Sequence, residues 1–374
     1  MTKRIFLLMG LSILAVVISH AAGWGQIAMI NWADRYRPVV APNFDQVGTL
    51  PYDFLVFIRQ LLAFAVPAFL FCSGFFVAYA SRGSQAVYSW KMARTRIIDL
   101  LQPYLFWSFV WLVLDALQHK IFTPLEYVAL LVLGKADGGS YFFVPLLCQF
   151  YVLSTVIVPL AKTKPKQLLI IASAIQAVTF GLQYLKIFST AIANSPFVEW
   201  IGLINYQALF FSWIVYFTLG VIFGFHGERI KQKLLPWKWL LVGIMVVAVA
   251  ISMFEAEYIY WTTGHDNRYV PFTISSILYS IAIILVYIVF DKIRIPASNL
   301  VQQIGGKSYG LYLVHLPMIE YAARIIRQIA PWLLAYQVTL FSPLMLVVGL
   351  AGPLLLMALT RKTPARKYYH FVFG

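Results

Sequence analysis

The chain of 374 residues is 61% hydrophobic and only 11% charged, and its formal net charge is +15 at pH 7. Soluble globular domains carry roughly 25% charged residues, so this composition excludes an ordinary soluble protein. The basic residues lie in short stretches between long apolar runs, which is the pattern of membrane orientation signals and not of a nucleic-acid-binding surface. We therefore predict an all-α, polytopic transmembrane bundle that has the lipid bilayer, and no nucleic acid, as its partner.

Ten apolar stretches are long enough to cross about 30 Å of hydrocarbon as helices. Because they follow one another along the whole sequence, we predict a single integral-membrane domain over residues 1–374. The first stretch begins like a secretory signal, but its apolar character continues to Ile30 and no hydrophilic domain follows, so we expect a retained span. The predicted spans are residues 5–23, 54–80, 98–117, 141–161, 167–185, 205–225, 237–254, 270–290, 308–325 and 337–360.

The distribution of basic residues predicts the orientation of these spans. If the N-terminus is cytoplasmic, 20 of the 29 lysines and arginines fall on the cytoplasmic side and eight on the outer side. Cytoplasmic loops of membrane proteins carry an excess of Lys and Arg. Both termini are therefore predicted to be cytoplasmic, in agreement with an even number of spans.

Two predicted outer segments have unusual sequences. Residues 124–140 are apolar at first but too short to span, so we expect them to lie at the interface or line a cavity. Residues 255–271 combine aromatic side chains with His265, Asp266 and Arg268, which fits either an interfacial aromatic belt or a carbohydrate-facing surface. The sequence has no internal repeat, which weakens the case for a transporter built from inverted repeats.

Two histidines lie inside apolar spans. Ionisable side chains are costly in a membrane, so His20 and His315 are functional-site candidates. The alternative for His20 is a ring that reaches the headgroups or binds a backbone carbonyl. At 1.5 Å per residue from the predicted cytoplasmic end of each span, His315 lies roughly 12 Å deep and His20 about 23 Å. The two rings are therefore not predicted to meet.

Arginines are candidates for function at two further positions, inside the second span and at one cytoplasmic helix entrance. Arg59 lies inside the second span, where it either extends towards the headgroups or pairs with an acid. Arg82, Arg94 and Arg96 surround one cytoplasmic helix entrance, where they are orientation signals or a site for phosphates. Ser73 and Gly74 are interpreted as helix-packing residues. The sequence lacks metal-ligand spacing, a phosphate loop, a dinucleotide fingerprint and a nucleophile elbow, so no metal or tightly bound cofactor is predicted.

Several sequence features occur together in a fixed order. They are His20, the segment 67–75 (PAFLFCSGF), the basic approach to Pro103 and Tyr104, the run 141–147 (YFFVPLL) before Tyr151, and the segment 308–315 (SYGLYLVH). In these features the chain resembles the acyltransferase-3 family of bacterial integral-membrane O-acyltransferases, which modify cell-surface sugars. The resemblance covers essentially the whole chain. Two positions depart from the family pattern, because Met9 and Asp99 stand where arginines are common.

The resemblance implies transfer of an acyl group, most often acetyl, from cytoplasmic acyl-coenzyme A to a hydroxyl of a sugar or polysaccharide. It also implies a multi-pass protein of the bacterial cytoplasmic (inner) membrane. His20 corresponds to the essential histidine, which acts as a general base or itself accepts the acyl group. The donor-binding candidates are Arg82, Arg94, Arg96 and Tyr104, and the substrate-site candidates are Arg59, Ser73, Gln149, Tyr151, His315 and Glu320.

Two other functional classes remain open at this stage. An exporter or flippase would move a saccharide or an acylated molecule without chemistry, and aromatic residues, Arg59 and Glu320 would then line its pathway. A sensory module would respond to pH through its histidines, although the sequence offers no soluble output domain. An exporter would consume no thioester, which separates it from the acyltransferase.

Overall fold

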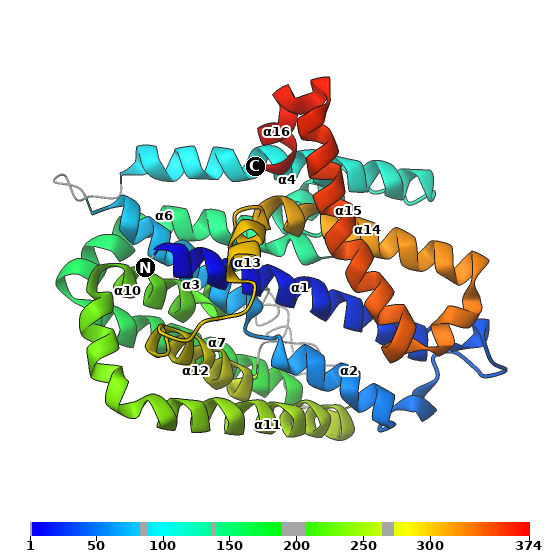
Figure 1. Cartoon of the computed structure of the whole chain (residues 1–374), viewed down its shortest axis with the longest axis horizontal. Helices are drawn as coiled ribbons and strands as arrows, with labels where there is room; N and C mark the ends of the chain where they lie inside the picture. Colours follow the sequence, from blue (N-terminus) through cyan, green and yellow to red (C-terminus); the bar gives the residue numbers. More distant parts are fainter. Residues whose placement is uncertain (1, 83–88, 137–138, 189–206, 264–272) are drawn as a thin grey trace.

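The computed structural model describes residues 2–82, 89–136, 139–188, 207–263 and 273–374. These residues form helices joined by short turns, and no strand occurs among them. Long helices run back and forth along the long axis of the molecule (Figure 1). The predicted all-α class is confirmed.

The long helices are α1 (Thr2–Ile30), α3 (Ala65–Ala80), α4 (Trp90–Leu117), α6 (Phe143–Thr163), α7 (Pro165–Phe188), α10 (Ile214–Leu234), α11 (Lys238–Thr263), α12 (Ile274–Val289), α14 (Ser308–Ile329) and α15 (Ser342–Lys362). The shorter helices are α2 (Leu50–Leu61), α5 (Pro124–Val132), α13 (Ser298–Gly305) and α16 (Tyr369–Phe373). Single helical turns are η1 (Ala33–Arg35), η2 (Phe44–Gln46), η3 (Ser140–Phe142), η4 (Phe210–Ser212), η5 (Leu235–Trp237), η6 (Pro331–Ala335), η7 (Gln337–Phe341) and η8 (Pro364–Tyr368).

Seven helical stretches of the described residues are long and apolar enough to cross a membrane, and α12 is a shorter apolar helix. The stretch Ile214–Thr263 contains both α10 and α11, which are joined at η5. The apolar sequence of α14 is interrupted by Glu320, Arg324 and Arg327. The polytopic bundle is thus confirmed, whereas length and apolarity support seven to eight spans and not the full ten.

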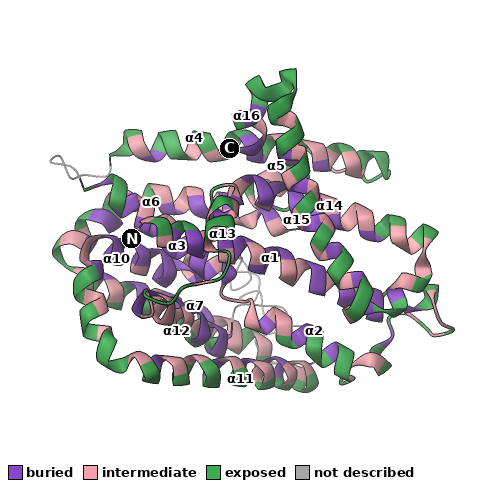
Figure 2. Cartoon of the chain, viewed as in Figure 1, coloured by how far each residue is buried: buried purple, intermediate pink, exposed green. Residues whose placement is uncertain are grey.

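The outer surface of the bundle is apolar. Large apolar side chains are exposed along α7, α11 and α15, among them Ile170, Ile171, Val178, Val246, Val247, Ile251, Phe254, Val347 and Leu355. Buried residues concentrate instead in α1, α3 and α10, at the centre of the molecule (Figure 2). Soluble proteins rarely expose continuous apolar surface, so these faces are suited to contact with lipid.

Helices α3 and α10 cross in close contact because each presents a glycine at the crossing. A Cβ on Gly74 would lie 2.2 Å from the carbonyl oxygen of Phe217, and a Cβ on Gly220 would lie 2.0 Å from that of Phe71. Only residues without a side chain allow two helix backbones to approach so closely. The packing role predicted for Gly74 is therefore confirmed.

The predicted second span, 54–80, is confirmed as part of the apolar stretch Leu50–Ala80, which consists of two helices, α2 and α3. The chain leaves the helical path between α2 and α3, over residues 62–64. Pro67 explains the break, since its ring clashes with the carbonyl four residues earlier and it donates no backbone hydrogen bond. At the end of α2, the carbonyl of Leu61 accepts a hydrogen bond of 2.6 Å from the hydroxyl of Tyr279. Such irregular backbone at membrane depth is tolerated where it is enclosed by protein or lines a cavity.

Helix α14 begins deep inside the bundle and not at its end. The preceding helix α13 packs against α1, where a Cβ on Gly10 would lie 2.0 Å from the carbonyl oxygen of Val301 and one on Gly305 2.2 Å from that of Phe6. Residue 305 therefore lies beside residues 6–10 of α1, and α14 begins three residues later. Within α14, Pro317 cannot donate to the carbonyl of Leu313, and the hydroxyl of Tyr141 donates to that carbonyl instead.

Two predicted outer segments also differ in detail. Helix α11 continues to Thr263, so Tyr258 and Trp261 are helical and not part of a loop, while His265, Asp266 and Arg268 lie outside the described residues. In the segment 124–140, α5 begins with a capping box in which Glu126 accepts a hydrogen bond of 2.7 Å from the backbone N–H of Thr123.

The α3–α10 crossing gives a first prediction. Gly220→Val should lower the melting temperature in detergent because the new side chain forces the two helices apart, at a cost of about 1–3 kcal/mol. Gly243→Val in α11 is the matched control, since a Cβ at that glycine meets no atom within 4 Å. Equal melting temperatures for the two variants would contradict the proposed contact.

Candidate active site

A cavity of about 950 Å³ lies between α1, α3, α4, α6 and α14. It brings together five of the residues singled out in the sequence, which are His20, Arg59, Ser73, Arg96 and Tyr151. Along α1 its lining extends from Phe6 to His20, a rise of roughly 21 Å at 1.5 Å per residue. The cavity is therefore long enough to connect the end of the bundle near the N-terminus with the deep histidine.

The two ends of the cavity differ in polarity. The deep end contains hydroxyl, amide and ionisable side chains, namely Ser19, His20, Arg59, Gln60, Ser140 and Gln207. The end near the N-terminus is lined mainly by apolar side chains, among them Phe6, Met9, Phe76, Val77, Met92 and Leu100, together with Tyr79, Tyr309 and the charged Arg96. A mainly apolar passage thus leads from an arginine to a polar chamber that holds the histidine.

The rings of His20 and His315 are in contact at the deep end of the cavity. Their centroids are 5.2 Å apart, with an angle of 56° between the ring planes. The sequence did not predict this contact, because the two depths were measured from the start of each span. The packing of α13 against α1 places Gly305 beside Phe6 and Gly10, and α14 begins three residues later, at Ser308. The start of α14 is therefore already inside the bundle, and the next two turns of this helix bring His315 to the level of His20.

Arg59 lies beside His20 because α1 has a glycine at the required position. A Cβ on Gly23 would be 3.3 Å from a terminal nitrogen of Arg59, so a larger residue would press on the guanidinium. Arg59 donates a hydrogen bond of 2.8 Å to the side-chain oxygen of Gln26 and is near enough to interact electrostatically with His20. Its charge is held inside the cavity wall, one helical turn from the imidazole.

At the other end, one face of α4 contributes to the cavity. Met92, Arg96 and Leu100 line it at intervals of four residues, which places them on the same side of the helix. The side chain of Arg94 is exposed and does not line the cavity. The other two donor-site candidates make structural contacts, since Arg82 donates to the carbonyl of Gly224 and the hydroxyl of Tyr104 donates to that of Leu131.

Gln149 supports the cavity without lining it. Its side-chain nitrogen donates to the carbonyl of Ala208 at 2.6 Å, and its side-chain oxygen accepts from the backbone N–H of Phe210 at 3.3 Å. These bonds hold the chain next to Gln207, whose side chain lines the cavity and donates to the carbonyl of Gly139 at 2.7 Å.

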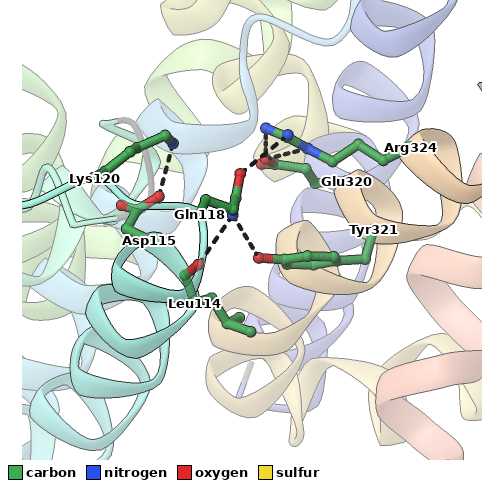
Figure 3. Close-up of polar contacts among 7 residues, drawn as sticks. All are labelled: Leu114, Asp115, Gln118, Lys120, Glu320, Tyr321 and Arg324. Atoms are coloured by element: carbon green, nitrogen blue, oxygen red, sulfur yellow. Dashed lines mark hydrogen bonds and ion pairs between the residues drawn. The ribbon is translucent and has the colours of Figure 1, made fainter.

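Glu320 lies in a polar network away from the cavity lining (Figure 3). It forms an ion pair of 2.6 Å with Arg324, one turn further along α14. Gln118, near the end of α4, accepts a hydrogen bond from Arg324 and donates one of 3.2 Å to the hydroxyl of Tyr321. Glu320 therefore pairs with Arg324, whose hydrogen bond to Gln118 joins the end of α4 to α14, and the predicted role of Glu320 at the substrate site stays a prediction.

Several polar residues of the deep end were not among the candidates from the sequence. Tyr312 lines the cavity, and its hydroxyl donates to the carbonyl of Ser140 at 2.7 Å. One signal was present, because Ser308, Tyr312 and His315 follow the i, i+4, i+7 spacing of one helical face. Ser140 and Gln207 carry no such signal, since only the fold brings their segments to the cavity.

The described residues thus form a membrane bundle whose internal cavity is lined by a histidine and an arginine. Residues 5–358 match the family described as "Acyltransferase domain", so the chain belongs to the acyltransferase-3 family of membrane acyltransferases. The family resemblance noted in the sequence is confirmed.

Two named relatives are distant. A Bacillus subtilis protein, "Putative membrane-bound acyltransferase YfiQ", is 26% identical over 265 residues, which cover 69% of this chain and 68% of that protein. A Staphylococcus aureus protein, "Probable poly-beta-1,6-N-acetyl-D-glucosamine export protein", is 22% identical over 271 residues, 72% of each chain. No solved structure shows a significant match to the chain.

Neighbouring residues of α3 offer a test of the cavity. In a Cys148→Ser background, Ser73→Cys should react with a small maleimide because residue 73 lines the cavity, whereas the adjacent native Cys72 is fully buried and should stay unlabelled. Mass spectrometry of the labelled peptide reports both sites at once. Labelling of residue 73 no faster than that of Cys72 would contradict an accessible cavity at this position.

Proposed function

We propose that the protein transfers an acyl group, with acetyl as the first candidate, from acyl-coenzyme A to a hydroxyl of a cell-surface sugar or polysaccharide. The observation that carries this proposal is the polarised cavity, in which His20 and Arg59 occupy a polar chamber and Arg96 stands at the far end of a mainly apolar passage. Family membership supports the acyl donor, because the family consists of acyltransferases.

The apolar passage suits the donor. Arg96 would hold a phosphate of coenzyme A, since a guanidinium pairs bidentately with phosphate oxygens. The acyl-bearing arm would then extend along α1 towards His20, over the apolar side chains between them. The bias of basic residues places this end of the bundle in the cytoplasm, where acyl-coenzyme A is made, with both termini on that side. The protein would accordingly lie in the bacterial cytoplasmic membrane.

His20 would act as the general base. Its neutral imidazole takes the proton of the sugar hydroxyl while the hydroxyl oxygen attacks the thioester carbonyl carbon. The resulting tetrahedral intermediate collapses when its carbon–sulfur bond breaks. The departing thiolate receives the proton from the imidazolium, so the products are the sugar ester and free coenzyme A.

Arg59 would stabilise the negative charge that forms on the carbonyl oxygen. It is fixed beside His20 by Gln26 before any substrate arrives, so little reorganisation is needed during the reaction. In a cavity that excludes most water, such a fixed cation acts more strongly than in bulk solvent.

The remaining polar groups suit a saccharide acceptor. Gln60 and Gln207 offer amide donors and acceptors, and Ser140 offers a hydroxyl, which are the groups that recognise sugar hydroxyls. The name of the Staphylococcus aureus relative refers to a polysaccharide, which supports the same class of acceptor.

That name also favours a second candidate function, the export of a saccharide without acyl transfer. The same cavity would then form part of a transport path, and Arg59 would contact the passing sugar. The two functions differ in chemistry, because only the acyltransferase converts a thioester into a free thiol.

Acyl transfer can be followed as thiol release from acetyl-coenzyme A by the purified protein in nanodiscs, in the presence of a surface-polysaccharide extract. His20→Ala should reduce the rate by about 10²- to 10⁴-fold, the typical contribution of a positioned base, while leaving the melting temperature unchanged.

Full turnover by folded His20→Ala would refute the role of His20. If wild-type protein binds saccharide but releases no thiol from acetyl, succinyl or longer acyl donors, the exporter becomes the better account.

Arg96→Ala should raise the KM for acetyl-coenzyme A about tenfold with little change in kcat, because a charge-assisted contact to phosphate contributes about 1.5–3 kcal/mol and part of it is screened at the exposed mouth. Arg229→Ala is the matched control, since it removes an exposed arginine from the end of α10, outside the cavity lining. An equal KM in wild type and Arg96→Ala would exclude this donor contact.

A further inference from the structure

The imidazole of His315 has one satisfied and one unsatisfied nitrogen. Its side chain is 1% exposed, and its Nδ1 lies 3.0 Å from the carbonyl oxygen of Leu311 on the preceding turn of α14. Its Nε2 is buried and has no hydrogen-bond partner within the described part of the chain. A buried polar atom left without a partner is unfavourable, so each one calls for an explanation.

The contact with Leu311 determines the tautomer of His315. A carbonyl oxygen only accepts hydrogen bonds, so the Nδ1 that faces it carries the hydrogen. In the neutral ring Nε2 is then a lone-pair acceptor. This buried nitrogen therefore lacks a hydrogen-bond donor.

His20 is the neighbour that can supply one. Its ring contacts that of His315 at a centroid separation of 5.2 Å. The ring of Tyr312 is further away, at 6.3 Å, and its hydroxyl donates to Ser140. The other side chains packed between α1, α14 and α15 at this level include Val17 and Ile319, which carry no donor.

We propose that His315 is a positioning residue, whose Nε2 accepts a hydrogen bond from one ring nitrogen of His20 and so turns the lone pair of the other nitrogen into the cavity. The inference rests on the proposed function, because it concerns His20 in its role as base. In the structure the two rings are in contact and this hydrogen bond is not formed. Catalytic hydrogen bonds are often long or poorly aligned and shorten in the course of the reaction.

The arrangement uses a neutral ring where soluble enzymes commonly use a carboxylate to orient a catalytic histidine. A carboxylate at this depth would be a second buried charge, which is costly in a membrane protein. When His20 takes up the hydroxyl proton, its imidazolium donates a stronger, charge-assisted hydrogen bond to the same Nε2. The proton stays on His20 until the departing thiolate takes it. His315 therefore keeps the same protonation state and the same hydrogen-bond partners throughout the reaction.

The first test compares two substitutions by kinetics. His315→Leu removes the acceptor and should lower kcat about 10- to 100-fold with the KM for acetyl-coenzyme A unchanged, because donor binding at Arg96 is untouched. His315→Gln offers its side-chain oxygen as an acceptor and should recover most of that loss. His226→Leu is the control, since His226 also binds a carbonyl across a helix contact, Ala161 at 2.9 Å, but does not line the cavity.

The second test reads the hydrogen bond directly and needs no turnover. In ¹⁵N-histidine-labelled protein in nanodiscs, with acetyl-coenzyme A bound, the His20 signal should show one tautomer in wild type and a mixture in His315→Leu. The signal is assigned by its loss in His20→Gln.

An unchanged kcat in His315→Leu, or a mixture of tautomers in wild type, would overturn the proposal even if acyl transfer occurs. Wild-type protein that releases no thiol would overturn the proposed function instead, and the nuclear magnetic resonance spectra would still decide whether His20 and His315 are paired.

Discussion

The contact of α1 with α13 is the constraint on which the candidate site depends. Gly10 and Gly305 allow the two backbones to meet, and this fixes the depth at which α14 begins. His20 lies ten residues beyond Gly10 on α1, and His315 lies about two turns beyond the start of α14. A side chain at either glycine would shift one helix along or away from the other, and the rings of His20 and His315 would separate. Backbone packing and the geometry of the candidate site are thus coupled in this protein.

The rest of the cavity results from local breaks in otherwise regular helices. Pro67 interrupts the second hydrophobic stretch, and the opened turn next to it widens the space beside Arg59 and Gln60. Around this core, the long helices present apolar side chains outwards (Figure 2). Polar and charged groups are costly in hydrocarbon, so collecting them at one end of an internal cavity both shields them from lipid and concentrates them for chemistry.

Much of this was predictable from the sequence, and the failures have definite physical causes. Apolar segments of membrane-spanning length indicated the helical bundle, and the cost of burying an imidazole indicated His20 and His315. Their contact was not predicted, because the estimate placed the start of each span at the membrane surface, whereas α13 brings Ser308 deep into the bundle. Gln207 and Ser140 could not be found either, since contacts such as Gln149 with Ala208 are distant in sequence.

The central claim is that one continuous cavity joins a donor site at Arg96 to the histidine pair. It is tested most directly by an experimental structure with a thioether analogue of acetyl-coenzyme A, which binds like the donor but cannot transfer its acyl group. The account predicts a phosphate next to Arg96, the arm along α1, and the acyl carbonyl between His20 and Arg59. Coenzyme A bound outside this cavity, or with its acyl group far from His20, would contradict it.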